Sequence, residues 1–275
     1  MGLFSGLHTK VAVYMLYRLW VHLFGMDERW GTLIIVVMII SMLVGSFGGL
    51  AENSLRRVLG YQMLNGMPFM LVMMAFTTHD PQRALGAGIL YMIHHMITMG
   101  SLILASGAIE ETYGTGRLNK LSGLERRDPI IAWIFAAGAF SIVGFPPFSG
   151  MWGKVLIVAE VARTGGGWAW AVIAVIIIAS FAAFLAMLRV WRRVFWGKDL
   201  PKEKVPKELV IRKKLMAPSA ALILGSLTMF ILSGPIIDVI QHASADLLDT
   251  EGYTQAVLGD DPVALPDIDS IQEGR

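Results

Sequence analysis

Ionisable side chains lie inside three apolar stretches of this sequence, where charges are normally rare. Lys10 lies about two turns into the first apolar stretch, and Lys154 follows a proline pair in a later one. A lysine at the centre of a bilayer costs at least about 2.5 kcal/mol on insertion scales, so two of them indicate a function. His94 and His95 stand together in a third stretch, and histidine titrates near neutrality, as a proton relay requires. These residue types indicate proton transfer inside a membrane.

The stretch around Lys154 predicts a membrane helix that is broken near its centre. Pro146 and Pro147 remove two backbone N–H donors in the middle of an apolar run from Ile130 to Val161. Non-helical backbone survives at membrane depth only where protein or water surrounds it. A break beside a charge is how transporters build ion sites. The alternative is a proline kink with a lysine that snorkels to the interface. The residues of the predicted break are Gly144, Pro146, Pro147, Gly150 and Gly153.

Two further sites stay open at this point. His94 and His95 are adjacent, so on a helix they point roughly 100° apart, and one can face a polar interior while the other packs against a neighbour. Either histidine could instead make an ordinary hydrogen bond between helices. Glu160 follows Lys154 by six residues and is either an exit carboxylate or an interface residue. We therefore assign His94 and Glu160 only to relay or support.

The composition is that of a polytopic membrane protein. Hydrophobic residues make up 55% of the chain and charged residues 16%, with a mean hydropathy of +0.60. Soluble domains carry about 25% charged residues. The absence of cysteine excludes disulfides, thiolate-bound iron–sulfur clusters and cysteine nucleophiles. No group of side chains has metal-ligand spacing, and no phosphate loop is present, so we expect neither a metal nor a cofactor.

The apolar stretches predict an all-α bundle of about seven spans. They cover approximately residues 3–24, 31–51, 58–77, 84–109, 129–162, 168–190 and 215–240. The fifth stretch is long enough for two helices, which would make eight spans. With seven spans, fifteen Lys and Arg residues share one face and four lie on the other. With eight, the largest basic cluster would move to the outer face. The positive-inside rule therefore favours seven spans and a C-terminus outside the cytoplasm.

The C-terminal part differs from the rest in charge. We predict a transmembrane domain over residues 1–241 and an acidic, non-cytoplasmic tail over residues 242–275. Such a tail is either a solvated, partly disordered end or partly docked on a neighbour. Docking is suggested by the apolar patches at 247–248 and 256–258.

Four segments resemble the proton-translocating, antiporter-like subunits of respiratory complex I and of Mrp-type multisubunit Na+/H+ antiporters. They are residues 3–14 around Lys10, the basic helix start at 55–61, the segment 91–96 with both histidines, and the broken helix 144–154. Their order agrees with the family over nearly the whole chain. The loop 114–124 and the tail residues 247–259 look most like the D subunit of the Mrp antiporter.

The resemblance implies a larger fold and a path for protons. Family members have about fourteen spans in two inverted five-helix repeats, and this chain resembles the second half. Lys10 would be the connecting lysine of the eighth span, Lys154 the lysine of the broken twelfth, and His95 the relay residue between them. Some relatives carry a lysine one turn after this histidine. Here Met99 stands at that position, so water would complete the relay.

The implied function is that of a subunit of a monovalent cation (Na+)/proton antiporter in the cell membrane, a secondary transporter and not an enzyme. Its partners would be the other membrane subunits of the complex and the bilayer. One interpretation adds a separate chain that supplies the first half of the family fold. One alternative is a proton-pumping subunit of an NADH:quinone oxidoreductase or a membrane-bound hydrogenase. Another is a structural half-subunit without its own ion path.

Overall fold

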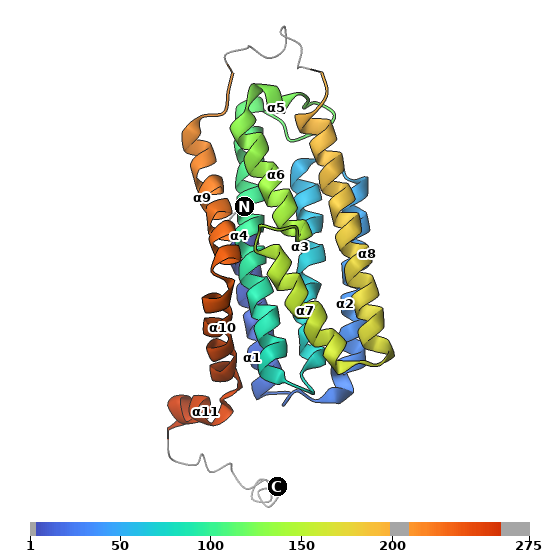
Figure 1. Cartoon of the computed structure of the whole chain (residues 1–275), viewed down its shortest axis with the longest axis vertical. Helices are drawn as coiled ribbons and strands as arrows, with labels where there is room; N and C mark the ends of the chain where they lie inside the picture. The colour runs from blue at the N-terminus through green and yellow to red at the C-terminus, as the bar shows by residue number, and fades with distance from the viewer. Residues whose placement is uncertain (1–3, 199–208, 260–275) are drawn as a thin grey trace, which may run out of the picture.

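The computed structural model describes residues 4–198 and 209–259 and consists of long helices that run side by side (Figure 1). Within these ranges the only extended pairing is an isolated bridge between Ser54 and Arg117. The α-helices are α1 (Thr9–His22), α2 (Gly31–Ala51), α3 (Leu55–Leu71), α4 (Pro81–Tyr113), α5 (Leu124–Arg127), α6 (Pro129–Val143), α7 (Gly150–Thr164), α8 (Gly166–Val190), α9 (Lys213–Ile231), α10 (Ser233–Leu248) and α11 (Thr250–Leu258).

Short segments of other helix types extend several of these helices. A π-helix, Phe4–His8, leads into α1, and a second one, Trp191–Phe195, ends α8. A 3-10 helix, Glu28–Trp30, begins α2, and another, Val72–Phe76, continues α3. The first of these π-helices lies directly before Lys10.

The all-α membrane bundle predicted from the sequence is confirmed. Five helical segments of the described residues are long and apolar enough to cross a bilayer. They are Glu28–Ala51, Leu55–Phe76, Pro81–Tyr113, Gly166–Phe195 and Lys213–Ile231. The remaining two predicted spans are built from shorter pieces, the first from the π-helix and α1, and the fifth from α6 and α7. The expected break therefore lies between two half-length helices.

The seventh span differs from the prediction, because it contains a second interruption. Instead of one helix over 215–240, the structure has α9 and α10, which meet at Leu232. Pro235 explains the interruption, since it lacks the N–H that would bond to the carbonyl of Ile231. The helix resumes with the bond from the Ile236 amide to the Leu232 carbonyl, at 3.1 Å.

The predicted boundary of the C-terminal tail lies within a helix. The boundary expected at residue 241 falls inside α10, which continues to Leu248 and is followed by α11. Tyr253 of α11 stacks on His22 at a centroid distance of 4.7 Å, and the guanidinium of Arg18 lies 4.9 Å from its ring centre. This part of the tail thus contacts the end of α1. Residues 260–275 lie outside the described ranges.

The long helix α4 is the centre of the bundle and packs against α3, α6, α7, α9 and α10 (Figure 1). It begins at Pro81, where the Asp80 carboxylate accepts a hydrogen bond from the Arg83 amide at 3.0 Å. It ends at Gly114, whose φ of +68° is the left-handed conformation common after helices. Both histidines lie near the middle of this helix.

Polar side chains fix the loops at the end of the bundle that carries the basic residues. Arg189 of α8 donates to the Leu50 and Glu52 carbonyls at 2.7 and 2.5 Å, and so satisfies the end of α2. Asp128 accepts hydrogen bonds from the Tyr113 hydroxyl and the Ile211 amide. These contacts hold α4, α6 and α9 in register above the site.

Candidate functional site

The break in the fifth span lies at the residues that the sequence predicted. The helix α6 ends at Val143, Gly144 takes a φ of +100°, and α7 begins at Gly150. The Pro146–Pro147 bond is cis. A β-carbon at Gly150 would come within 1.9 Å of the Ser141 carbonyl oxygen, so only glycine allows the two half-helices to approach this closely. The break is a packed element of the bundle, not a simple kink.

Lys154 turns back from α7 to the end of α6. Its ammonium donates to the Val143 carbonyl at 2.7 Å and to the Ser180 hydroxyl of α8 at 2.9 Å. Val143 is the last residue of α6, where carbonyls lack partners within the helix and carry the negative end of its dipole. The lysine therefore caps the broken helix. Its Nζ also lies 5.1 Å from the centre of the Phe69 ring.

The two histidines are both fully buried, but they have different surroundings. His94 shares a hydrogen bond of 2.8 Å between its Nδ1 and the Ser149 hydroxyl, at the start of α7. Both ring nitrogens of His95 lack a hydrogen-bond partner. The His95 ring lies against Gly66 of α3, where an added β-carbon would be 2.0 Å from Nε2. His94 thus belongs to the break, while His95 faces α3.

Lys10 is buried just after the π-helix, with 3% of its surface exposed. Its ammonium donates to the Thr9 hydroxyl at 3.1 Å. The structure thus places the residues named from the sequence in the interior of the bundle: Lys10, His94 and His95 are buried, and Lys154 is half-buried.

Glu160 lies apart from this region, near the end of α7. Its carboxylate pairs with Arg163 at 2.8 Å, one turn along the same helix. This ion pair lies within α7 and stabilises the end of that helix.

A ring of buried hydroxyl groups was not anticipated from the sequence. The groups are those of Thr98, Ser141, Ser149 and Ser226, and the ring closes through His94 Nδ1. The successive distances are 2.8 Å from His94 to Ser149, 2.8 Å from Ser149 to Ser226, 2.9 Å from Ser226 to Ser141, 2.9 Å from Ser141 to Thr98, and 3.3 Å from Thr98 to His94. The ring joins α4, α6 and α9 to the residue before α7.

Several buried polar groups near His95 have no partner in the protein. They include the amide nitrogen and oxygen of the Gln62 side chain and the side-chain oxygen of Asn65, on the same face of α3. A buried polar group without a partner costs roughly 1–3 kcal/mol, and ordered water usually binds there. These atoms of α3 are therefore candidates for contact with ordered water. In the described ranges no three His, Cys, Asp or Glu residues could together hold a metal ion.

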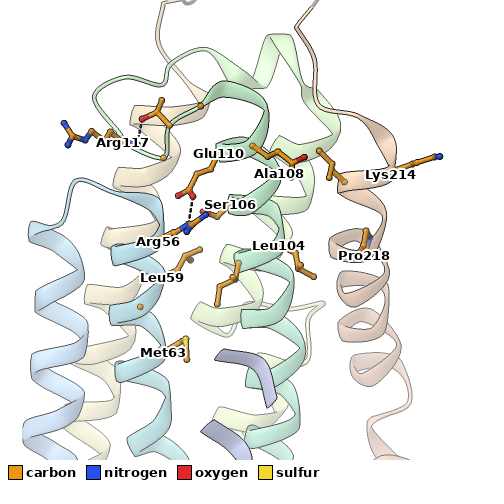
Figure 2. Close-up of a pocket in the computed structure, with 18 of the residues that line it drawn as sticks. Arg56, Leu59, Met63, Leu104, Ser106, Ala108, Glu110, Arg117, Lys214 and Pro218 are labelled. Carbon is orange, nitrogen blue, oxygen red and sulfur yellow. Dashed lines mark hydrogen bonds and ion pairs between the residues drawn. The ribbon is translucent and has the colours of Figure 1, made fainter. Parts of the chain in front are cut away.

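A cleft of about 1280 Å³ opens between α3, α4 and α9 at the basic end of the bundle (Figure 2). Arg56 and Glu110 form an ion pair across it, and the hydroxyl of Ser106 on its wall is buried without a partner. The cleft extends to Thr9, the hydrogen-bond partner of Lys10.

Comparison with known proteins gives a consistent assignment. The family model described as "NADH:quinone oxidoreductase/Mrp antiporter, TM" matches residues 2–185. The D subunit of the Na(+)/H(+) antiporter of Bacillus subtilis (strain 168) is 30% identical over 94% of this chain and 51% of its own length. The corresponding D subunit of Alkalihalophilus pseudofirmus is 28% identical over the same shares. The chain thus spans about half the length of these curated relatives.

Solved structures show the same fold. A chain of the Mrp complex from Dietzia sp. DQ12-45-1b matches with a TM-score of 0.84 and 32% identity, over 94% of this chain and 55% of that one. A chain of an archaeal membrane-bound sulfane sulfur reductase matches with a TM-score of 0.80 and 19% identity, over 93% and 50%. A chain of respiratory complex I from Thermus thermophilus matches with a TM-score of 0.68 and 19% identity, over 80% of this chain and 45% of that one. At 19% identity the last two likenesses concern the fold alone.

The hydroxyl ring gives a prediction about stability. Replacing Ser226 with alanine removes one hydroxyl that bonds to two others and to the Ser149 amide, so we expect a loss of about 1–3 kcal/mol. Thr228→Ala is the matched control on the same helix, because that hydroxyl is exposed and bonds only to its own turn. Thermal denaturation of the purified protein in detergent measures both. Equal midpoints for the two variants would contradict a structural role of the ring.

Proposed function

Because the chain belongs to the NADH:quinone oxidoreductase/Mrp antiporter transmembrane family, we propose that it carries protons as a membrane subunit of a monovalent cation (Na+)/proton antiporter. The observation that supports this most strongly is Lys154, which lies beside a broken helix and donates to its terminal carbonyl. The names of the curated relatives and the 32% identity to a chain of an Mrp complex support the antiporter over other family functions. Since the chain spans about half of those relatives, the whole activity is a proposal.

The proposed proton path runs through Lys10, His95 and Lys154. His95 accepts and releases a proton at ring nitrogens that make no hydrogen bond in the protein. Met99 is apolar and cannot continue a chain of side chains, so water between Gln62, Asn65 and His95 completes the path. A proton on one lysine disfavours a proton on the neighbouring group by charge repulsion, so the protonation of one group switches that of the next.

The second candidate is a proton-pumping subunit of an NADH:quinone oxidoreductase or a membrane-bound hydrogenase. The fold shared with complex I and with the archaeal reductase supports it. The two candidates differ in their partners, because a redox-driven pump needs electron carriers that this cysteine-free chain does not bind through thiolates. The third candidate, a scaffold without its own ion path, predicts that Lys154 is dispensable for transport.

Location and partners follow from the same proposal. The chain lies in the cell membrane with the loops of its basic face in the cytoplasm and its acidic C-terminal tail outside. Residues 1–241 act as the transmembrane domain and residues 242–275 as the tail, with α10 and α11 joining them. The partners are other membrane subunits of the antiporter complex. The apolar side chains of α1 exposed in this chain, such as Val11 and Met15, support a neighbour or lipid there.

Replacing Lys154 with alanine tests the proposal. We expect sodium-driven pH change in everted vesicles to fall by at least about tenfold, since the variant removes the proton carrier and raises the barrier by more than about 1.4 kcal/mol. Lys213→Ala is the control, because Lys213 is exposed at the start of α9. Both variants are compared at equal assembly of the complex. Unchanged exchange in Lys154→Ala would support the scaffold, and pH change driven by a redox substrate instead of sodium would support the pump.

The position of His95 gives a second test that leaves every titratable group in place. In Gly66→Ala the new methyl group occupies the space of His95 Nε2, so the ring must move, and we expect sodium-driven exchange to fall as in His95→Ala. The control is Gly60→Ala on the same helix, where an added β-carbon meets nothing within 4 Å. If Gly66→Ala and Gly60→Ala exchange equally well, the placement of His95 is not important for transport.

A further inference from the structure

The polar groups of the proposed path fall into two sets, and no hydrogen bond joins Lys154 to His95, Gln62 or Asn65. Lys154 directs its hydrogen bonds to Val143 and Ser180, away from α4. The second set consists of His95 with Gln62 and Asn65, whose buried side-chain atoms lack protein partners. Neither ring nitrogen of His95 bonds to Lys154. A proton must therefore cross a region between the two sets.

Two aromatic side chains fill that region. Phe69 of α3 and Tyr91 of α4 each expose 1% or less of their surface. Their rings stack with centroids 5.3 Å apart and an angle of 15° between the ring planes. The Lys154 ammonium lies 5.1 Å from the Phe69 ring centre, and the Tyr91 ring lies 5.4 Å from His94 and 6.0 Å from His95. The contacts thus run from lysine to phenylalanine, then to tyrosine, then to the histidines.

The register of the helices fits this order. On α3, Gln62, Asn65 and Phe69 recur at three- and four-residue spacing and share one face. On α4, Tyr91 and His95 are one turn apart and share a face in the same way. Because Phe69 meets Tyr91 and Gly66 meets His95, the polar groups occupy one level of this interface and the aromatic pair occupies the next.

We propose that Phe69 and Tyr91 form an aromatic barrier that keeps water and protons from passing freely between Lys154 and His95. This inference rests on the proposed function and adds the gating residues of the path. The stacked ring faces of Phe69 and Tyr91 offer a proton no hydrogen-bond partner, which makes the passage of a charge between them costly. The barrier therefore prevents a proton leak while Lys154 is held at the Val143 carbonyl.

Only part of this barrier is free to move. A β-carbon at Gly153 of α7 would lie 3.0 Å from the Tyr91 ring and 3.3 Å from its Cα, so the α7 backbone holds Tyr91 in place. Lys154, by contrast, is only partly buried, and a charged ammonium is attracted to the face of an aromatic ring. The Lys154 side chain crosses the barrier by leaving the Val143 carbonyl and turning past Phe69 with its proton.

The test is the proton leak without any cation gradient. Vesicles that contain the assembled complex receive an imposed pH gradient in sodium-free buffer, and its decay is followed with a pH dye. We expect Phe69→Ala to accelerate the decay several-fold over wild type, because the removed ring opens a space for water between the two polar sets. Phe69→Val makes a smaller space and should give an intermediate leak, and it serves where the alanine variant assembles poorly.

Phe135→Ala is the matched control. Phe135 is equally buried and packs on Phe195 at 5.0 Å, in a different part of the core. It should leak no more than wild type. A leak that is unchanged in both Phe69 variants, or equal in Phe69→Ala and Phe135→Ala, would overturn the barrier. The result is separate from the proposed function, because that function fails if wild-type vesicles show no sodium-driven exchange, whatever the leak.

Discussion

The hydrogen bond from Lys154 to the Val143 carbonyl is the interaction on which the rest of the site depends. A helix that stops inside a bilayer leaves backbone carbonyls without partners, and each costs several kcal/mol in hydrocarbon. Here an ammonium group meets that need at 2.7 Å. The same contact gives a buried charge a counterpart, which a lone lysine at this depth would lack. The broken helix and the lysine therefore stabilise each other, and removing either one exposes the other.

The hydroxyl ring holds the other end of the break, where α7 begins. Ser149, the residue before α7, has no side-chain bond to its own helix, and its amide and hydroxyl instead meet Ser226 of α9. The ring also fixes the orientation of His94 from α4. The two ends of the break are thus held by different helices, α8 through Ser180 and α9 through Ser226. The aromatic pair lies beside this frame, so Lys154 can turn past Phe69 only by giving up its bond to the Val143 carbonyl.

The sequence made the spans and the break predictable, but not the second interruption or the ring. Runs of apolar residues and the pair Pro146–Pro147 carry their own local signals, since proline cannot donate within a helix. Pro235 carries the same signal, but it stands close to a polar segment where a helix end was expected. Lone serines such as Ser226 carry no local signal, because their role depends on which helices become neighbours. His94 and His95 were visible, yet only packing against Gly66 and Ser149 separates their roles.

The central claim is that Lys154 exchanges its proton and does not merely cap α6. The most direct measurement is sodium-driven proton movement in vesicles that contain Lys154→Arg. Arginine keeps the positive charge and the donors for the Val143 carbonyl, but it does not give up its proton in proteins. The account predicts a complex that assembles normally and has lost exchange. Exchange at the wild-type rate would mean that the charge at this position is structural and that the proton path lies elsewhere.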